Sequence, residues 1–430
     1  MNMEDMILIS VDDHLVEPPQ AFINHIHEKY KDKAPKVVKG DQGEDTWLVE
    51  DLELPNIALN AVVGRPYEEY GMEPTAFDQL RPGTYELAGR IDDMNVNGVL
   101  AGLNFPSVPG VGGQNLEGVK DKKLAYAIMQ AWNDWHLDEW CAAEPARFIP
   151  LAIISTWDPE GAAKEIARVA RKGCHAITFP PNPASTGQPS IHSEAWDPVW
   201  KACIENDVNV CMHIADASSG VPSGDSPVDV MITNMPVSLY STATDLTYSP
   251  LFRKYPDLRF SLSEGGVGWI PHFLERVDYV HERHIWTNQD FRDRQPSSYF
   301  KDQVFTCFID DPHGVKSRHE VGIDKMMWEC DYPHSDTTWP ESPEVLWRSM
   351  KDVPEAEVNA ITHENAMRAY SFNPFQHMDK SECTVGALRA KATHVDTAQR
   401  HIGEGTPPAK HDGVVTVSDI MAQLSKMHRG

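Results

Sequence analysis

The sequence predicts one α/β domain of the parallel (β/α)8 type, the TIM barrel. Eight short apolar runs recur along the chain, and segments with helical periodicity separate them. The runs lack the alternation of a half-exposed strand, which indicates parallel strands buried on both faces. No internal repeat is visible, and a doubly wound open sheet is the alternative fold.

The eight predicted strands are these apolar runs, taken in chain order. They cover residues 7–11, 98–105, 148–154, 176–179, 208–213, 259–264, 304–309 and 325–331. Helices are expected between them, at residues 85–94, 124–141, 158–171, 195–205, 246–254 and 271–283, and a terminal helix at residues 355–370 follows the last strand. The helix at 158–171 has the clearest ends, because an acidic first turn with Pro159 opens it and Gly173 follows it.

The chain is longer than a bare barrel requires. A barrel needs about 250 residues, whereas this chain has 430. Residues 1–374 are predicted to form the barrel, with residues 15–90 as an insertion after the first strand at the barrel mouth, too long for an ordinary connection. Residues 375–430 are predicted to be a C-terminal extension with an amphipathic last helix, which would pack on its own surface, on the barrel mouth or on a neighbouring subunit.

Composition narrows the classes of partner. The formal charge of −26 and the lack of a basic stripe argue against nucleic acid and anionic membranes. No apolar run is long enough to span a bilayer, and the N-terminal segment does not resemble a signal peptide. Seven scattered cysteines indicate a reducing compartment. We therefore expect a cytoplasmic protein that acts on a small molecule, with a homodimer as one option for its assembly.

Side chains that bind metal ions lie at the ends of four of the eight predicted strands. They are Asp12 and His14 directly after the first strand, and the last residues of the fifth, sixth and eighth strands, His213, Glu264 and Asp331. Because the carboxyl ends of parallel strands meet at one mouth of a barrel, we expect these side chains to converge. Crowded carboxylates repel one another in an apolar barrel, and a divalent cation relieves that cost. Each residue alone also fits a hydrogen-bonding or capping role, but the joint pattern predicts one or two ions, with zinc, iron and manganese all compatible.

The same segments resemble motifs of a known family. The segments are the D-x-H-x-x-E-P opening of residues 12–18, His213, the S-E-G-G of residues 263–266, the W-E-C-D-Y-P-H of residues 328–334 and the E-N-A of residues 364–366. They are similar to the amidohydrolase-related branch of the metal-dependent hydrolases, which includes the aminocarboxymuconate-semialdehyde decarboxylase-like enzymes. The resemblance covers residues 7–374. It implies a TIM barrel, a divalent metal, and either hydrolysis or non-oxidative decarboxylation.

Two positions depart from the family pattern. Asp12 occupies the first place of the common H-x-H opening and still offers a ligand. Glu264 stands before the paired glycines, where many decarboxylases of the family carry a histidine. A carboxylate at this place weakens the decarboxylase interpretation and favours a hydrolytic site with two metal ions.

The main functional prediction is therefore a metal-dependent hydrolase. It would cleave an ester, thioester, amide or lactone of a small organic substrate, which could be aromatic, with a metal-activated water. Asp331 is the candidate for proton transfer, His334 for orienting the substrate, and His272 is a weaker catalytic candidate. One alternative is a metal-dependent decarboxylase of an aromatic or unsaturated carboxylic acid, and a second is a non-catalytic metal-binding barrel.

Three further residues are predicted to bind the substrate. Trp269 and Trp339 lie near predicted strand ends, and Arg65 lies in the insertion. Aromatic side chains here favour an apolar or ring-bearing substrate, although aromatic residues also pack barrels for structural reasons.

Overall fold

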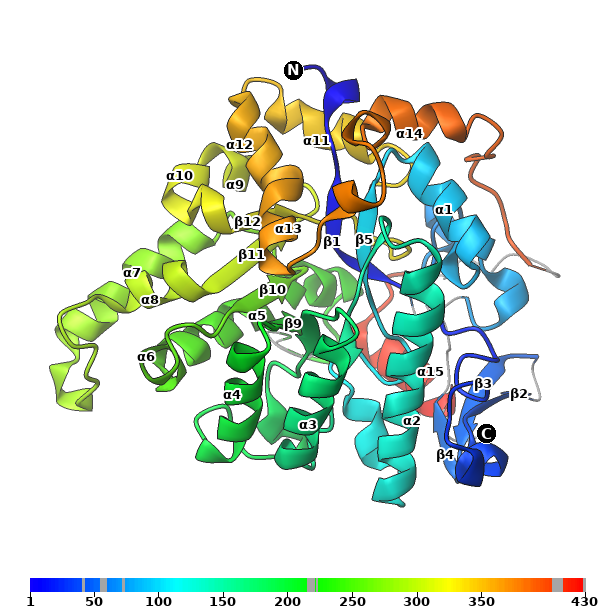
Figure 1. Cartoon of the computed structure of the whole chain (residues 1–430), viewed down its shortest axis with the longest axis horizontal. Helices are drawn as coiled ribbons and strands as arrows, with labels where there is room; N and C mark the ends of the chain where they lie inside the picture. The colour runs from blue at the N-terminus through cyan, green and yellow to red at the C-terminus, as the bar shows by residue number, and fades with distance from the viewer. Residues whose placement is uncertain are drawn as a thin grey trace.

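A ring of eight parallel strand positions forms the centre of the molecule, and helices surround it (Figure 1). The computed structural model describes residues 1–40, 43–54, 60–71, 74–214, 221, 223–403 and 413–427. The strands of the ring are β1 (Ile9–His14), β5 (Ala101–Phe105), β6 (Phe148–Ile149), β7 (Ala152–Ile153), β8 (Ala176–Thr178), β9 (Asn209–His213), β10 (Phe260–Ser263), β11 (Val304–Phe308) and β12 (Met326–Trp328). The short β6 and β7 occupy one strand position between them.

Neighbouring strands follow the chain order around the ring. One parallel sheet has the order β1-β5-β6, and a second runs from β7 through β12. The two are continuous at residues 150–151, which join β6 to β7. On the other side, Asp331 N donates to Asp12 O at 2.8 Å and His14 N donates to Tyr332 O at 2.7 Å, so the segment after β12 pairs with β1. The predicted barrel fold is confirmed.

Helices cover the outside of the ring. They are α1 (Leu87–Val96), α2 (Lys122–Trp135), α3 (Pro159–Ala170), α4 (Asp197–Glu205), α5 (Val228–Tyr248), α6 (Leu251–Lys254), α7 (Ile270–Arg283), α8 (Pro296–Gln303), α9 (Pro312–Lys316), α10 (Arg318–Val321), α11 (Ser342–Met350), α12 (Glu355–Asn359), α13 (Asn365–Ala369), α14 (Val385–Lys391) and α15 (Val417–Met427). In α3 the buried Ala162, Ile166 and Val169 recur at helical spacing. Asp158 caps this helix by accepting the N–H of Gly161 at 3.0 Å.

Alternate residues of the strands fill two separate layers of the core. Along β9, Val210 and Met212 pack in the layer beneath the helices, whereas Cys211 packs in the cluster inside the ring. This alternation follows from the two-residue repeat of a strand. His213 continues the inner series, so its imidazole reaches the inside of the barrel mouth.

The insertion after β1 contains a small antiparallel sheet that the sequence did not predict. Its strands are β2 (Lys36–Lys39), β3 (Asp45–Val49) and β4 (Leu52–Leu54), in the order β2-β3-β4. Trp47 of β3 is fully buried and packs edge-on against Phe22 at 5.3 Å between ring centroids. The boundaries 15–90 of the insertion stay a prediction.

The C-terminal extension contacts the barrel at several places. Val385 N, at the start of α14, donates to Met6 O at 2.9 Å. After α14 the chain runs past α1, where His394 Nε2 lies 3.4 Å from Asp92 Oδ2 (Figure 1). Farther on, residues 415–418 hydrogen-bond with residues 224–228 beside α5. Residues 404–412 lie outside the described part of the chain, and the division at residue 374 stays a prediction.

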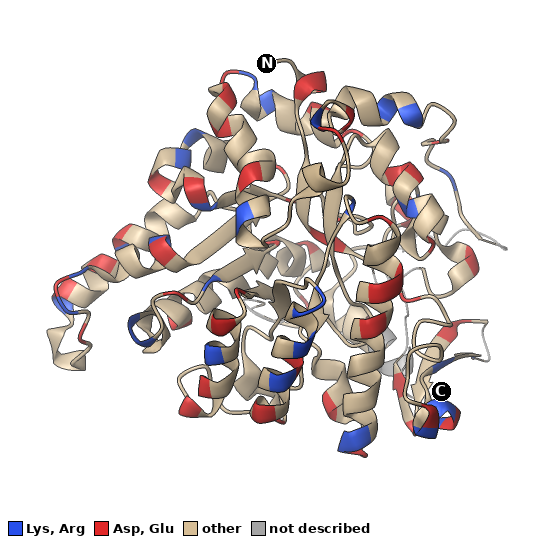
Figure 2. Cartoon of the chain, in the orientation of Figure 1, with Lys and Arg blue, Asp and Glu red and all other residues tan. Residues whose placement is uncertain are grey.

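Charged side chains are distributed over the outer helices. Figure 2 shows Lys and Arg scattered among the more numerous Asp and Glu residues. None of the described helices combines the length and the apolar character needed to cross a bilayer. The cytoplasmic location and the homodimer stay predictions.

Candidate metal centre at the barrel mouth

A bulge in β1 turns two of the predicted ligands toward the inside of the ring. Val11 packs in the inner cluster, so regular alternation would send Asp13 there next. The pairing of β1 with β5 shifts its register between Ser10 and Asp13, and such a bulge re-aims the side chains that follow it. Asp12 and His14 consequently reach the site, while Asp13 accepts a hydrogen bond from Ser10 Oγ at 3.0 Å.

The five predicted ligands converge around one point. His14 Nε2 lies 3.4 Å from both Asp12 Oδ1 and Asp331 Oδ1. His213 Nε2 lies 3.4 Å from Asp12 Oδ2 and 2.9 Å from Glu264 Oε2. The Nε2 atoms of His14 and His213 are 3.1 Å apart. Side chains from β1, β9 and the ends of β10 and β12 therefore meet as the sequence predicted.

His334 belongs to the same cluster. Its Nδ1 atom lies 3.0 Å from Asp331 Oδ1, and its ring stacks on that of His14 with 3.8 Å between centroids. The side chains form two overlapping groups in which every residue offers one ligand atom, and the ligand atoms of a group all lie within 4.8 Å of one another. The groups are Asp12, His14, His213 and Glu264, and His14, Glu264, Asp331 and His334. His14 and Glu264 are common to both groups.

The carboxylates of Asp12 and Asp331 are buried without hydrogen bonds. Both side chains are 0% exposed, and none of their four oxygens accepts a hydrogen bond from the part of the chain that the structure describes. Burying a carboxylate without hydrogen bonds costs several kcal/mol. A divalent cation bound by these oxygens and the nearby imidazoles would offset that cost, and the mixed nitrogen and oxygen donors suit zinc, iron or manganese.

Burial also governs the protonation of the carboxylates. It raises the pKa of Asp12 and of Asp331 well above the ordinary range of an aspartate, and the nearby charge of Glu264 raises both further. The imidazole of His213 acts in the opposite direction on Asp12. The cluster therefore favours added positive charge, whether this comes as protons or as a metal ion.

The imidazoles respond to the same surroundings. Burial lowers the pKa of His14 well below its usual range, and that of His334 to about 4. At His213 burial acts in the same direction, but the charges of Asp12 and Glu264 outweigh it and raise the pKa to about 10. Neutral imidazoles such as those of His14 and His334 are the form of histidine that binds metals.

The backbone is strained at two of the ligands. Glu264 has φ of 66° and Asp331 has φ of 55°, both in the left-handed region that side chains other than glycine seldom adopt. Such residues cost about 1–3 kcal/mol each and cluster at functional sites. β10 ends at Ser263, directly before Glu264, and β12 ends at Trp328, three residues before Asp331, so both strands are shorter than the sequence predicted.

Glu329 supports the site and was missed by the sequence reasoning. It is 1% exposed, and its Oε2 atom accepts the N–H of Glu264 at 3.1 Å and the S–H of Cys307 at 2.6 Å. Burial raises its pKa to about 7. The available signal was its position two residues before Asp331 on an extended segment, which places both carboxylates on one face.

Arg90 of α1 also supports the site and was missed. Its guanidinium is buried, donates to the backbone oxygen of His14 at 2.5 Å and to that of Gly83 at 2.6 Å, and lies 4.4 Å from the centre of the Tyr332 ring. A buried arginine on a helix that faces the barrel gave only a weak signal in the sequence. Its hydrogen bond to the backbone of His14 holds the end of β1 in place.

The structure does not bring His272 to the cluster. This side chain is exposed in the first turn of α7, and it belongs to neither of the two groups of possible ligands. The neighbouring Trp269 is partly exposed, donates from Nε1 to Gly265 O at 2.9 Å and packs against Phe273 at 5.5 Å between ring centroids. The structure thus places His272 outside the metal cluster, and its catalytic role stays a prediction.

Trp339 and Arg65 are buried in contacts with other parts of the protein. Trp339 Nε1 donates to Asp93 O at 3.1 Å. Arg65 is 1% exposed, and its Nη2 atom donates to Gln79 O at 3.1 Å and to Ile402 O at 3.0 Å. These contacts give both residues a structural role, and their predicted contact with a substrate stays a prediction.

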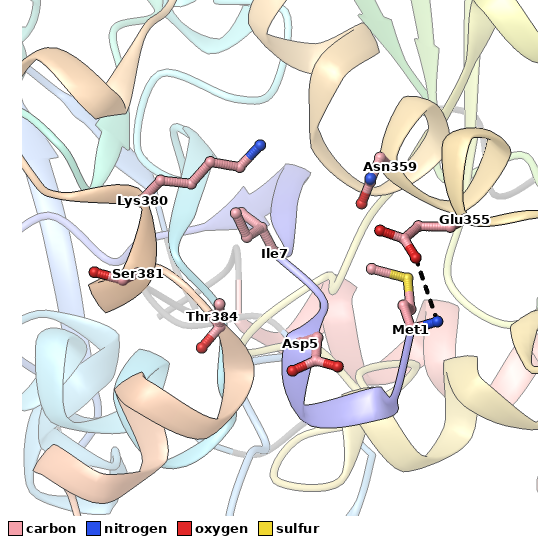
Figure 3. Close-up of a pocket in the computed structure, with 8 residues that line it drawn as sticks. All are labelled: Met1, Asp5, Ile7, Glu355, Asn359, Lys380, Ser381 and Thr384. Atoms are coloured by element: carbon pink, nitrogen blue, oxygen red, sulfur yellow. Dashed lines mark ion pairs between the residues drawn. The ribbon is translucent and has the colours of Figure 1, made fainter.

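A second hollow lies at the opposite end of the ring. It measures about 360 Å³, and Ile7, which precedes β1, is one of the residues that line it (Figure 3). The amino group of Met1 pairs with Glu355 at its edge at 3.3 Å. None of the predicted site residues lines it. Because TIM barrels carry their active sites at the carboxyl ends of the strands, the metal cluster is the better candidate site.

Comparison with known proteins identifies the family. A sequence model described as Amidohydrolase matches residues 51–372, which is well over half of the chain. The chain belongs to the amidohydrolase family. The resemblance predicted from the metal-binding motifs is thereby confirmed, as is the prediction of an enzyme of this superfamily.

Relatives of this amidohydrolase include a decarboxylase. The gamma-resorcylate decarboxylase of Polaromonas sp. (strain JS666 / ATCC BAA-500) is 23% identical over 304 residues, which are 66% of this chain and 86% of the relative.

Solved structures share its fold. An amidohydrolase from Mycobacterium avium subsp. paratuberculosis K-10 has a TM-score of 0.66 and 19% identity, and the match covers 84% of this chain and 98% of that one. The 5-carboxyvanillate decarboxylase of Novosphingobium aromaticivorans DSM 12444, solved with bound manganese and 3-methoxy-4-hydroxy-5-nitrobenzoic acid, has a TM-score of 0.62 and 20% identity, covering 86% of this chain and 99% of that one. At sequence identities this low, the structural similarity shows only that the proteins share a fold.

Proposed function

We propose that this amidohydrolase is a divalent-metal-dependent decarboxylase of a hydroxylated aromatic carboxylic acid. The observation that carries the proposal is the set of buried carboxylates that accept no hydrogen bond from described residues and lie among imidazoles at the barrel mouth, in a chain whose relatives include decarboxylases of such acids. This was the alternative prediction from the sequence. The comparisons support it better than the main prediction, hydrolysis.

The ligands of the ion are proposed to be those that the geometry assembles. They are Asp12, His14, His213, Glu264 and Asp331, with His334 beside them. One or two ions of manganese, zinc or iron fit this donor set. When bound, the ion would supply the positive charge that holds the carboxylate and a ring hydroxyl of the substrate.

The reaction needs a proton at the ring carbon that carries the carboxyl group. As the bond between this carbon and the carboxyl group breaks, its electron pair stays on the ring carbon, which takes the proton, and carbon dioxide leaves. Asp331 is the proposed donor of that proton. His334 Nδ1 lies 3.0 Å from Asp331 Oδ1 as an ion-pair contact, without the geometry of a hydrogen bond, and its imidazole is the proposed positioning group for this carboxyl group.

Hydrolysis is the second candidate function, and Glu264 is the observation that favours it. Glu264 Oε2 lies 2.9 Å from His213 Nε2, at the place where many decarboxylases of the family carry a histidine. This extra carboxylate would suit a second cation and the two-metal chemistry of hydrolases.

One assay separates the two candidates. The manganese-loaded protein is incubated with gamma-resorcylate and 5-carboxyvanillate, and in parallel with aryl esters, thioesters and lactones. We expect carbon dioxide release from a hydroxybenzoate-type acid, and its loss in the Asp331→Asn variant. Cleavage of an acyl compound without carbon dioxide release would overturn decarboxylation in favour of hydrolysis, and no turnover of either class would favour a non-catalytic barrel.

A further inference from the structure

The C-terminal extension lies beyond the part of the chain that matches the family, which ends at residue 372. Its residues 396–402 nevertheless lie against the insertion. Arg400 N donates to Gly64 O at 3.0 Å, and His401 Nδ1 lies 2.8 Å from Glu69 Oε2. Arg65 Nη2 donates to Ile402 O at 3.0 Å. Several hydrogen bonds therefore join two segments that are more than 300 residues apart in the sequence.

A first route leads from this contact to the metal centre. The amide N–H of Val63, which neighbours Gly64, donates to Pro333 O at 3.1 Å. Pro333 lies between the site residues Asp331 and His334. The backbone of the insertion thus links residues 400–402 of the extension to the segment that carries two members of the cluster.

A second route reaches the same segment through side chains. Arg81 donates from Nη2 to Asp396 O at 2.9 Å, and its Nε and Nη2 atoms bind the carboxylate of Asp93 at 2.7–2.9 Å. The other donor to this carboxylate is the hydroxyl of Tyr332, at 2.6 Å from Asp93 Oδ2. Tyr332 directly follows Asp331, and its backbone oxygen accepts the N–H of His14 at 2.7 Å.

The two routes are independent and end on adjacent residues. One ends on the backbone of Pro333, and the other ends on the side chain of Tyr332. Both residues lie in the short turn between Asp331 and His334. Buried hydrogen-bond networks that hold metal ligands in place commonly change metal affinity by about 10–100-fold when they are disrupted.

We propose that residues 396–402 of the C-terminal extension brace the Asp331–His334 segment and thereby set the geometry of the metal centre. Asp93 is the positioning residue of this brace, since it joins Arg81 to Tyr332. The proposal rests on the proposed metal site for its effect on ion binding. The effect of residues 396–402 on the backbone order of the Asp331–His334 segment can be measured without metal.

Gly403 offers a way to disturb the brace from the side of the extension. It has φ of 114°, and a Cβ atom at this position would lie 2.9 Å from Gln79 Cγ and 3.3 Å from Gln79 Cα. The Gly403→Ala variant therefore pushes the extension away from the insertion without altering any residue of the site. Gly413→Ala is the matched control, because Gly413 has φ of 124° and no described atom lies within 4 Å of its added Cβ.

The experiment compares full-length wild type with both variants. Hydrogen exchange is followed in the peptide that contains Asp331 and His334, whose amides donate to Asp12 O at 2.8 Å and to Asp331 O at 2.9 Å. The dissociation constant for Mn²⁺ is measured on the same samples. We expect Gly403→Ala to accelerate exchange in this peptide and to weaken Mn²⁺ binding about tenfold, and Gly413→Ala to match the wild type.

Faster exchange confined to the extension and the insertion, with the Asp331–His334 peptide and Mn²⁺ binding unchanged, would overturn the brace. Should Gly403→Ala fail to fold, His401→Ala removes only the contact with Glu69 and must shift both quantities in the same direction, or the brace is overturned. A wild type that binds no Mn²⁺ would refute the proposed function, and the exchange comparison would still decide the brace.

Discussion

Glu17 and Asp331 are equally buried carboxylates near the same barrel mouth, but they have opposite surroundings. Both are 0% exposed. Glu17 accepts three hydrogen bonds, from Ser107 N at 3.1 Å, Val108 N at 3.0 Å and Trp132 Nε1 at 2.8 Å. Asp331 accepts none from the described residues. The chain satisfies the carboxylate that holds a loop and leaves unsatisfied the one that faces the site.

The same contrast recurs between two other buried aspartates. Asp93 resembles Glu17, since the side chains of Arg81 and Tyr332 satisfy it. Asp12 resembles Asp331, since both of its oxygens are buried and accept no hydrogen bond from described residues. Unsatisfied buried charge costs several kcal/mol. A bound cation would offset this cost at Asp12 and Asp331, which is the basis of the predictions below.

Replacing the unsatisfied carboxylate should have the largest effect on activity. In Asp331→Asn we expect the kcat of the manganese-loaded enzyme to fall about 10³-fold, because the proposed proton donor is lost. The metal-free variant should be as stable as the wild type or more stable, since an unpaired buried charge has been removed. Steady-state kinetics and urea unfolding measure the two effects. An Asp331→Asn variant that keeps the wild-type kcat would contradict the functional role of the Asp331 carboxylate.

Removing the metal should destabilise the protein only when the carboxylates of Asp12 and Asp331 are both present. At a free Mn²⁺ concentration about 100 times the dissociation constant, binding stabilises the folded state by about 2.7 kcal/mol. We therefore expect a chelator to lower the free energy of unfolding of the wild type by this amount. The double variant Asp12→Asn, Asp331→Asn is the control and should not respond to the chelator. Equal responses of the two proteins would place the ion elsewhere.

Replacing the satisfied carboxylate should cost stability and leave the ion in place. Glu17→Gln keeps the shape of the side chain but sets an amide group against at least one N–H donor. We expect a loss of about 1–3 kcal/mol in the free energy of unfolding, measured with urea in the presence of chelator. The dissociation constant for Mn²⁺ should stay near that of the wild type. Loss of Mn²⁺ binding at unchanged stability would make Glu17 a functional residue instead.

His136 extends the comparison to imidazoles. It is 0% exposed, its Nδ1 atom lies 3.0 Å from Leu151 O, and its ring stacks on Trp132 at 4.8 Å between centroids. Burial lowers its pKa to about 4.

The unfolded chain then takes up a proton below pH 6.5 that the native His136 refuses until about pH 4. Stability must fall as the pH falls through this window. From His136 alone we expect a loss of about 1 kcal/mol between pH 6.5 and pH 5.5. His136→Gln should remove that part of the slope in urea unfolding at several pH values. An unchanged slope would show that His136 is protonated in the native state.

Much of the fold could be predicted from the sequence because local pattern determines it. Buried parallel strands are short apolar runs, and all eight predicted runs became strand positions in the predicted order. The side chains at the carboxyl ends of these strands must then meet at one mouth of the barrel. The proximity of Asp12, His213 and Asp331 could therefore be predicted from the sequence.

The remaining features depend on contacts between distant segments. The three-stranded sheet of the insertion has no strong local signal, because charged residues interrupt the apolar runs of its short strands. Glu329 and Arg90 support the site through backbone atoms of other segments, which no spacing rule reveals. His272 was a weaker candidate at the start of the helix after the sixth strand, and its exposure and its place outside the two ligand groups depend on how α7 packs, which sequence proximity does not give.

The central claim is that the unsatisfied carboxylates share a cation with the imidazoles of His14 and His213. Crystals grown with Mn²⁺ and measured at the manganese absorption edge test it most directly. The account predicts an anomalous peak bounded by His14 Nε2, His213 Nε2 and the carboxylates of Asp12 and Asp331, and loss of the peak in the double variant Asp12→Asn, Asp331→Asn. A peak elsewhere, or an empty cluster at saturating Mn²⁺, would contradict it.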